Sequence, residues 1–271
     1  MDATLTALSI YPVKSCRGIA LDASRLTMRG LEHDREWMLV DLDGRFLTQR
    51  QLPRMAQIVP KLSISALQLS APGMPAFSIP LESDAERMTV TVWRDILGAL
   101  DQGDEAATKL SRWLGSDVRL VRFDPEERRY CNPQYAGNDG AHHAFADGYP
   151  VLVISVASLA DLNGRLDDPL PMNRFRPNMV IDGVDAFDED HFTEIGIGDI
   201  TLRLVKPCVR CRITTTDQVT AEVGIEPLPT LASYRRDDAL EGVTFGMNAI
   251  VAAGAGATLA VGDAVRANLD F

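Results

Sequence analysis

Apolar and polar residues alternate along the first third of the chain, which is the pattern of half-buried β-strands. Residues 87–93, RMTVTVW, alternate strictly, and residues 4–11, TLTALSIY, predict another strand. Residues 36–51 contain two further strand-like segments on either side of Asp43-Gly44. Because Asp-Gly is typical of two-residue hairpin turns, we expect a hairpin there.

A helical period occurs in two segments. In residues 103–115, apolar side chains recur at the spacing of one helix face, with Asp104 as the expected N-terminal cap and Gly115 as the stop. Residues 155–166 predict a second helix, capped by Ser155 or Ser158.

The rest of the second half predicts strands rather than helices, at residues 151–155, 176–182, 194–205 and 211–216. Many short strands, few helices and no βαβ rhythm favour a β-rich α+β fold with a barrel-like domain. Residues 124–150 are polar and rich in Gly, Pro and Asn, which predicts a long functional loop. We expect two parts, residues 1–122 and 123–271.

The charge composition argues against two classes of binding partner, nucleic acids and anionic membranes. The chain of 271 residues has 27 basic and 38 acidic side chains, a net charge of −11. Such an acidic surface argues against nonspecific binding to nucleic acid or to an anionic membrane. The sequence shows neither a signal peptide nor a transmembrane segment. Its four cysteines are too few for a disulfide framework. We therefore expect a cytoplasmic protein with reduced thiols, no nucleic-acid partner and no membrane partner.

Cys208 and Cys211 form a C-x-x-C pair in the segment VKPCVRCRITTTD. A zinc site lacks a second pair of ligands, and a thioredoxin-type pair would begin a helix. If the segment is extended, the two sulfurs point to opposite faces. One thiolate facing a cavity would then bind a soft metal centre or act as a nucleophile. Two buried structural cysteines remain the alternative.

Basic residues also lie at predicted strand ends. Lys14 and Ser15 follow the first strand, Arg35 precedes another, and Arg174 and Arg176 precede a third. If they converge, they form a site for a phosphate. Solvated surface charges are the alternative for any one of them alone.

Several motifs together resemble the family of MOSC proteins, named after the C-terminal domain of molybdenum cofactor sulfurase, with an N-terminal β-barrel region. They cover nearly the whole chain in order: YPVKSCRG, HDREWMLVD, LTQRQLPRM, SLADLNGRL, FRPNMVI, IGDITLRLVKPCVRCRITTTD and EPLPTLASYRR followed by FGMNAIV. Among relatives, the functional resemblance is to amidoxime-reducing components. The resemblance implies a MOSC β-barrel core and a smaller N-terminal β-barrel-like region.

The family binds a molybdenum–molybdopterin cofactor, and the resemblance implies that Cys211 is the protein ligand of the metal and the catalytic residue. It further implies cofactor contacts from Lys14, Ser15, Arg35, Asp147, Gly148, Tyr149, Arg176, Val209, Arg210 and Asn248. Gly148 and Tyr149 depart from the small hydroxyl residues typical of their positions. The basic members of the set would supply positive charge for the pterin phosphate.

The resemblance implies a reductase of N-hydroxylated compounds, such as hydroxylamines and amidoximes. Two alternatives stay open: a sulfur-transfer protein carrying a cysteine persulfide, and a non-enzymatic cofactor carrier. The chain contains no iron–sulfur cysteine cluster and no dinucleotide fingerprint after a strand. We therefore expect a separate redox protein to donate electrons.

Overall fold

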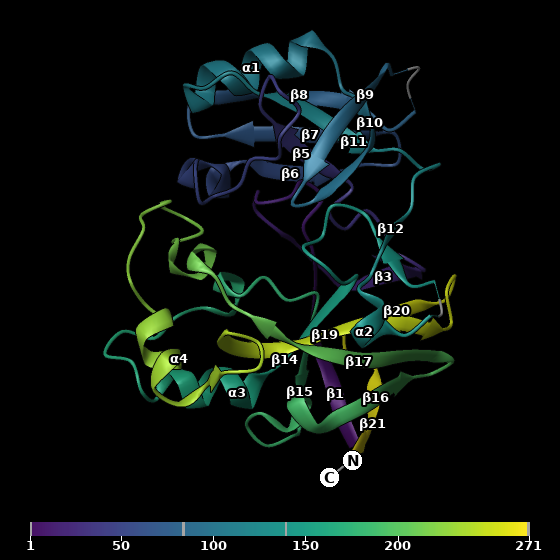
Figure 1. Cartoon of the computed structure of the whole chain (residues 1–271), viewed down its shortest axis with the longest axis vertical. Helices are drawn as coiled ribbons and strands as arrows, with labels where there is room; N and C mark the ends of the chain where they lie inside the picture. The colour runs from purple at the N-terminus through teal and green to yellow at the C-terminus, as the bar shows by residue number, and fades with distance from the viewer. Residues whose placement is uncertain (1, 83–84, 139, 270–271) are drawn as a thin grey trace.

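The fold is described from a computed structural model that covers residues 2–82, 85–138 and 140–269. A closed barrel of seven strands forms the larger part, at the lower half of Figure 1. Its strands follow one another around the barrel in the order β14 (Val151–Ser155), β15 (Met179–Asp182), β1 (Asp2–Ile10), β21 (Ala264–Leu269), β16 (Phe192–Ile197), β17 (Ile200–Val209) and β19 (Gly242–Ala253). Pairing of β14 with β19 closes the ring, so the β-rich fold class predicted from the sequence is confirmed.

The first strand of the chain belongs to this barrel. β1 lies between β15 and β21 and pairs antiparallel with both. Its alternation places Leu5 and Leu8 in the barrel core, although they are three positions apart. A register shift between Leu5 and Ala7 reconciles their spacing with a common face. The division of the chain after residue 122 stays a prediction, since β1 pairs with strands from beyond it.

The smaller part, at the top of Figure 1, contains a four-stranded and a three-stranded sheet. The strand order across the four-stranded sheet is β5 (Trp37–Val40), β11 (Arg119–Phe123), β10 (Asp95–Asp101) and β9 (Arg87–Val92). The order across the three-stranded sheet is β6 (Val59–Leu62), β7 (Ala66–Ala71) and β8 (Met74–Pro80). Its core packs Trp37, Leu67 and Trp113, the last from α1 (Asp104–Leu114). The chain enters the smaller part after Glu36 and leaves it at Phe123, and the Phe123 amide donates to the Glu36 carbonyl at 2.7 Å. The two ends of this segment therefore lie side by side.

The predicted helices form, with changes at their ends. α1 ends at Gly115, whose φ of 70° is left-handed, but its N-cap is Gly103, and Asp104 is already helical. The second helix, α3 (Val156–Asn163), is capped by the Ser155 side chain and ends before the expected Leu166. The chain turns at Asp43-Gly44 as expected, with Gly44 at φ 76°, but the Asp41 amide donates to the Arg45 carbonyl, so the loop has three residues. Instead of the predicted second strand, Arg45 and Phe46 form isolated bridges.

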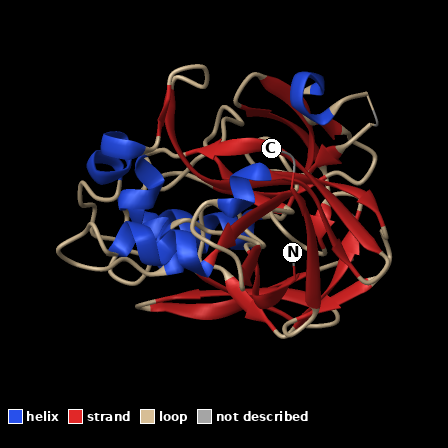
Figure 2. Cartoon of the chain, turned by 90° about the horizontal axis from the view of Figure 1, so that it is seen from below, coloured by secondary structure: helices blue, strands red, loops and turns tan. Residues whose placement is uncertain are grey.

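Short elements complete the chain, most of them around the barrel. In Figure 2 most helical segments lie on the left, and one lies apart at the upper right. These elements are β2 (Ile19–Leu21), β3 (Ala23–Thr27), β4 (Gly30–Leu31), β12 (Arg129–Tyr130), β13 (His142–His143), β18 (Arg236–Asp237), β20 (Thr258–Ala260), α2 (Pro133–Ala136), α4 (Leu228–Tyr234) and the 3₁₀ turns η1 (Pro53–Gln57), η2 (Met172–Arg174), η3 (Asp188–His191) and η4 (Arg212–Thr215). The predicted loop at 124–150 thus contains β12, α2 and β13, while residue 139 lies outside the described residues.

Candidate active site

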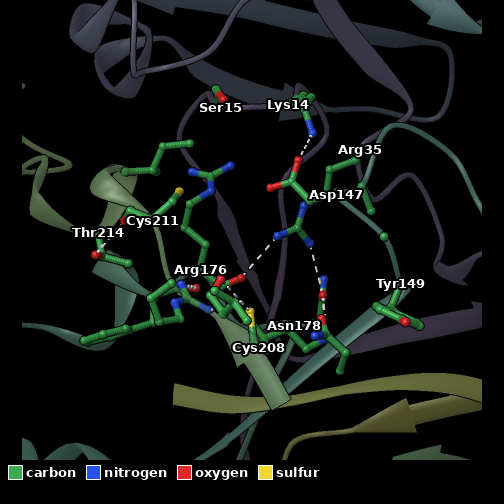
Figure 3. A pocket seen from close by; sticks show the side chains of 18 of the residues that line it. Lys14, Ser15, Arg35, Asp147, Tyr149, Arg176, Asn178, Cys208, Cys211 and Thr214 are labelled. Carbon is green, nitrogen blue, oxygen red and sulfur yellow. Dashed lines mark hydrogen bonds and ion pairs between the residues drawn. The ribbon is translucent and has the colours of Figure 1, made fainter. Parts of the chain in front are cut away.

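One pocket is lined by every residue that the resemblance assigned to cofactor or metal, and Figure 3 shows it from close by. Its volume is about 120 Å³. Sequence reasoning did not assign a role to Thr48, Ala146, Leu152, Phe175, Asn178, Cys208, Ile213 or Thr214, which also line it. Most of these are uncharged and resemble ordinary core or loop residues in sequence.

Two arginines form one wall of the pocket, Arg176 buried and Arg35 partly buried. The guanidinium carbons of Arg35 and Arg176 lie 4.3 and 4.1 Å from the ring centroid of Tyr11, just after β1. Arg35 donates to the Asp34 carboxylate at 2.6 Å and to the Asn178 side chain at 3.0 Å. Arg176 instead donates to the carbonyl of Cys16 at 2.6 Å. Asn178 ties this wall to the barrel, because its side chain also accepts from the Leu152 amide at 3.1 Å.

The two arginines differ in how their charge is compensated. Burial alone would lower the pKa of Arg35, but the Asp34 carboxylate outweighs it, and the pKa is raised. The pKa of Arg176 is lowered to about 10, by burial and by the neighbouring Arg35. Arg176 is thus a buried cation without a paired carboxylate among the described residues. Such a cation favours an anionic ligand.

Lys14 lies across the pocket from Arg176, on the loop after β1. Its ammonium donates to the Phe145 carbonyl at 2.7 Å and forms an ion pair with Asp147. Burial lowers the pKa of Lys14. Enclosure would raise the pKa of Asp147, but Lys14 and Arg50 outweigh it, and that pKa is lowered. The lowered pKa keeps Asp147 ionised, and this carboxylate competes with any anion for Lys14.

Backbone strain concentrates at this pocket. Ser15, Arg35 and Arg176 have positive φ values of 65°, 49° and 56°. A residue other than glycine in this region costs about 1–3 kcal/mol, and such residues cluster at functional sites. No sequence pattern reveals this strain, because these residue types usually adopt negative φ.

The two cysteines are placed differently from the sequence expectation. Residues 211–216 are not a strand, because Cys211 precedes the 3₁₀ turn η4 and its carbonyl accepts from the Thr214 amide and hydroxyl at 3.0 and 2.9 Å. The prediction of a strand over residues 211–216 was therefore wrong. Cys208 lies in β17 and Cys211 has an extended backbone, yet both cysteines line the pocket, so the expectation that one sulfur faces a cavity and the other the core is not met. They still differ in surroundings, as Figure 3 shows: Cys211 lies on the side of Ser15, and Cys208 lies near Asn178.

The sulfur of each cysteine contacts a different arginine. Arg210 donates to the Cys208 sulfur at 2.9 Å, and Cys208 packs against the apolar cluster of Phe175 and Phe245. Arg50 donates to the Cys211 sulfur at 3.3 Å. Arg50 stands in the motif LTQRQLPRM, but its spacing from the C-x-x-C gives no hint of this contact. Cys208 thus also packs against apolar side chains, whereas Cys211 is not part of that cluster.

Two family models match this chain: the MOSC N-terminal beta barrel domain over residues 2–117, and the MOSC domain over residues 140–266. "Mitochondrial amidoxime reducing component 2" of Bos taurus is 38% identical over 249 residues, which are 88% of this chain and 74% of the bovine protein. The chain belongs to the MOSC family. "Mitochondrial amidoxime-reducing component 1" of Homo sapiens is 35% identical to this MOSC protein, over 90% of this chain and 75% of its own. Among solved structures, the YUAD protein from Bacillus subtilis covers 98% of this chain and 94% of its own, with 10% identity and a TM-score of 0.42.

The pocket of this MOSC protein fits an anionic cofactor that brings its own metal. Its lining has four basic side chains and one carboxylate, the reverse of the balance in the whole chain. The buried Nε of Arg210 has no hydrogen-bond partner in the described chain. The described residues include no group of three or more His, Cys, Asp or Glu side chains that could hold a metal ion. A metal here would need most of its ligands from the cofactor, with a cysteine adding one.

No helix in the described part of this MOSC protein has the length and apolar character needed to cross a bilayer.

Proposed function

We propose that this chain is a molybdenum cofactor-dependent reductase that converts N-hydroxylated compounds, such as hydroxylamines and amidoximes, to amines and amidines. What supports the proposal most is a single arrangement: a thiol, Cys211, in one pocket with an excess of buried positive charge. The relatives named as amidoxime-reducing components supply the reaction class. A cytoplasmic location stays a prediction, since these relatives are named as mitochondrial.

In this proposal the chain holds the cofactor at two ends. Lys14, Arg35, Arg176 and Arg210 bind the phosphate of the pterin through charge-assisted hydrogen bonds. The Cys211 thiolate, a soft donor, completes the coordination of the metal. The uncharged members of the assigned set, Ser15, Gly148, Tyr149, Val209 and Asn248, line the pocket between them, and Asp147 balances part of the charge.

The proposed reaction is a two-electron reduction that cleaves the N–O bond of the substrate. An amidoxime, two electrons and two protons give an amidine and one water, so the N–O bond breaks and nitrogen is reduced. When bound, the cofactor supplies the two electrons to the N–O bond. A separate redox protein would restore them. The chain orients the substrate and excludes competing water, which is the usual share of the protein in a cofactor enzyme.

The two cysteines give a matched test. Cys211→Ser replaces a soft thiolate by a hard, protonated hydroxyl, so we expect loss of turnover with the fold intact. Cys208→Ser leaves the metal ligand in place and is expected to keep most activity. Both are compared with wild type in an anaerobic assay that follows oxidation of reduced viologen together with amidine formation. Molybdenum content is measured in each preparation.

The outcomes separate the proposal from its alternatives. Amidine formation by wild type that disappears in Cys211→Ser and persists in Cys208→Ser supports it. If wild type contains molybdenum yet forms no amidine above the Cys211→Ser background, the reductase proposal fails. Mass spectrometry of the C-x-x-C peptide then tests for an added sulfur atom, which would indicate sulfur transfer; an unmodified peptide would indicate a carrier.

A further inference from the structure

The two-residue turn between β9 and β10 carries an exposed indole to the edge of the pocket. Trp93 is 47% exposed, and its φ of 58° is left-handed. A bulky side chain is strained in this conformation, whereas glycine and asparagine are the ordinary residues of such turns. Stability of the hairpin therefore accounts for neither the strain nor the exposure of a large apolar ring. Strained residues of this kind are concentrated at ligand sites.

Two contacts connect Trp93 to the proposed catalytic sulfur through Arg50, and a third connects it to Asp147. The Arg50 guanidinium carbon lies 4.8 Å from the centroid of the Trp93 ring. Arg50 in turn donates to the Cys211 sulfur at 3.3 Å. On the other side, the indole N–H of Trp93 donates to the Asp147 carboxylate at 3.3 Å. The indole is thus held between Arg50, which contacts the sulfur, and the Asp147 carboxylate.

We propose that Arg50 and Trp93 form a substrate rim, and that the Trp93 ring selects flat, conjugated N-hydroxylated compounds over small aliphatic ones. This inference rests on the proposed function. A planar amidoxime joined to an aromatic ring has a π-face that stacks on indole and on guanidinium. Phe46 supports the indole, with ring centroids 4.9 Å apart, and nearly half of the Trp93 surface stays open to a ligand.

Benzamidoxime and acetamidoxime provide a matched pair of probes, because they share the reacting group and differ only in phenyl against methyl. The quantity measured is the ratio of their kcat/KM values, with molybdenum-loaded protein and reduced viologen as the donor. Trp93→Ala is expected to lower this ratio by about 2- to 12-fold, which corresponds to about 0.5–1.5 kcal/mol. Trp93→Phe keeps a stacking ring and is expected to stay within about twofold of wild type.

A control and a second measurement make the test specific. Ile96→Ala removes another exposed apolar side chain, 73% exposed, from the same hairpin, and is expected to keep the wild-type ratio.

Equilibrium binding of benzamidoxime to oxidised, molybdenum-loaded protein needs no reductant and no turnover. Its Kd is expected to rise in Trp93→Ala by a similar factor. If Trp93→Ala does not fold, Trp93→Gly, which is unstrained at this φ, replaces it in both measurements.

If Trp93→Ala leaves both the ratio of kcat/KM values and the Kd for benzamidoxime unchanged, the proposal of a substrate rim fails. It also fails if Ile96→Ala changes the ratio as much as Trp93→Ala does. Failure of wild type to reduce either amidoxime would overturn the proposed function instead, and the Kd comparison would still decide whether Trp93 binds flat ligands.

Discussion

Arg176 combines three unfavourable features: it is buried, it lies beside another cation, and its backbone is left-handed. These features make sense together if an anion completes the site. A charge-assisted hydrogen bond contributes about 1.5–3 kcal/mol, so Arg176→Ala is expected to weaken cofactor binding by about tenfold to a hundredfold. The measured result would be low molybdenum content with near-normal activity per bound molybdenum.

Arg174→Ala is the matched control for this prediction. Arg174 is two positions away and pairs with Asp217 at 3.1 Å, outside the pocket lining. Its replacement is expected to leave molybdenum content unchanged. Full occupancy with dead chemistry in Arg176→Ala would instead give Arg176 a role in the reaction.

At the scale of residues, the sequence predicts charge and chemistry better than placement. Basic residues at strand ends, such as Lys14 and Arg176, were candidates before the resemblance was considered, and they do line one pocket. Their cofactor roles remain predictions. Asn178 could not have been found from pattern, because its importance lies in bonds to Arg35 and to the Leu152 amide, far away in sequence. Trp93 was visible only as the end of an alternating strand.

At the scale of elements, the closing pair of the barrel depends on one glycine. Gly246, in β19, has φ 75°, and a Cβ there would lie 2.5 Å from the Ile154 side chain and 2.9 Å from the Val153 carbonyl of β14. Gly246→Ala is therefore expected to reduce the free energy of unfolding by about 2–4 kcal/mol, through strain and overpacking. Urea unfolding of the cofactor-free wild type and variant measures this difference in the free energy of unfolding.

A substitution at Gly73, in the turn between β7 and β8, separates the cost of backbone strain from the cost of steric contact. Its φ of 78° is nearly that of Gly246, but a Cβ there meets nothing within 4 Å. Gly73→Ala is expected to cost only the strain, about 1–2 kcal/mol. Equal losses in the two variants would show that the β14–β19 approach is not tight.

Elements were predictable where the signal is local. The turn at Asp43-Gly44 and the end of α1 at Gly115 depend on residues that the conformation itself requires, and both lie where expected, although isolated bridges replace the strand predicted after the turn. The segment 211–216 did not, because β-branched residues favour strands, whereas here Thr214 and Thr215 bond back to the carbonyls of Cys211 and Arg212. Side-chain bonds of this kind compete with strand pairing and leave no periodic trace.

At the scale of the whole molecule, the chain enters and leaves the smaller part at one place, between Glu36 and Phe123. The fragment 123–271 lacks β1, which would open the barrel by leaving one edge of β15 and one edge of β21 unpaired, and would leave the core without Leu5 and Leu8. We expect this fragment not to fold cooperatively. Circular dichroism during thermal unfolding is the measurement, and a cooperative transition for the fragment would contradict the expectation.

The control for that experiment keeps β1. A chain that joins residues 1–36 to 123–271 through a short Gly/Ser linker retains every barrel strand, and its junction spans the 2.7 Å bond between Glu36 and Phe123. It is expected to unfold cooperatively. Sequence alone could not have assigned β1 to the barrel, because alternation identifies a strand without naming its neighbours.

The place of β1 between β15 and β21 also sets the order of events during synthesis. The smaller part has its own sheet partners as soon as residue 123 has been made, whereas β1 waits for residues 264–269. At about 5–20 residues per second, that wait is on the order of 10–50 s. Throughout it, residues 2–4 of β1 lack their β21 partner, so this part of the strand edge is open to the wrong neighbours. The yield of folded protein in a cell therefore depends on what shields its first strand while the ribosome completes the last.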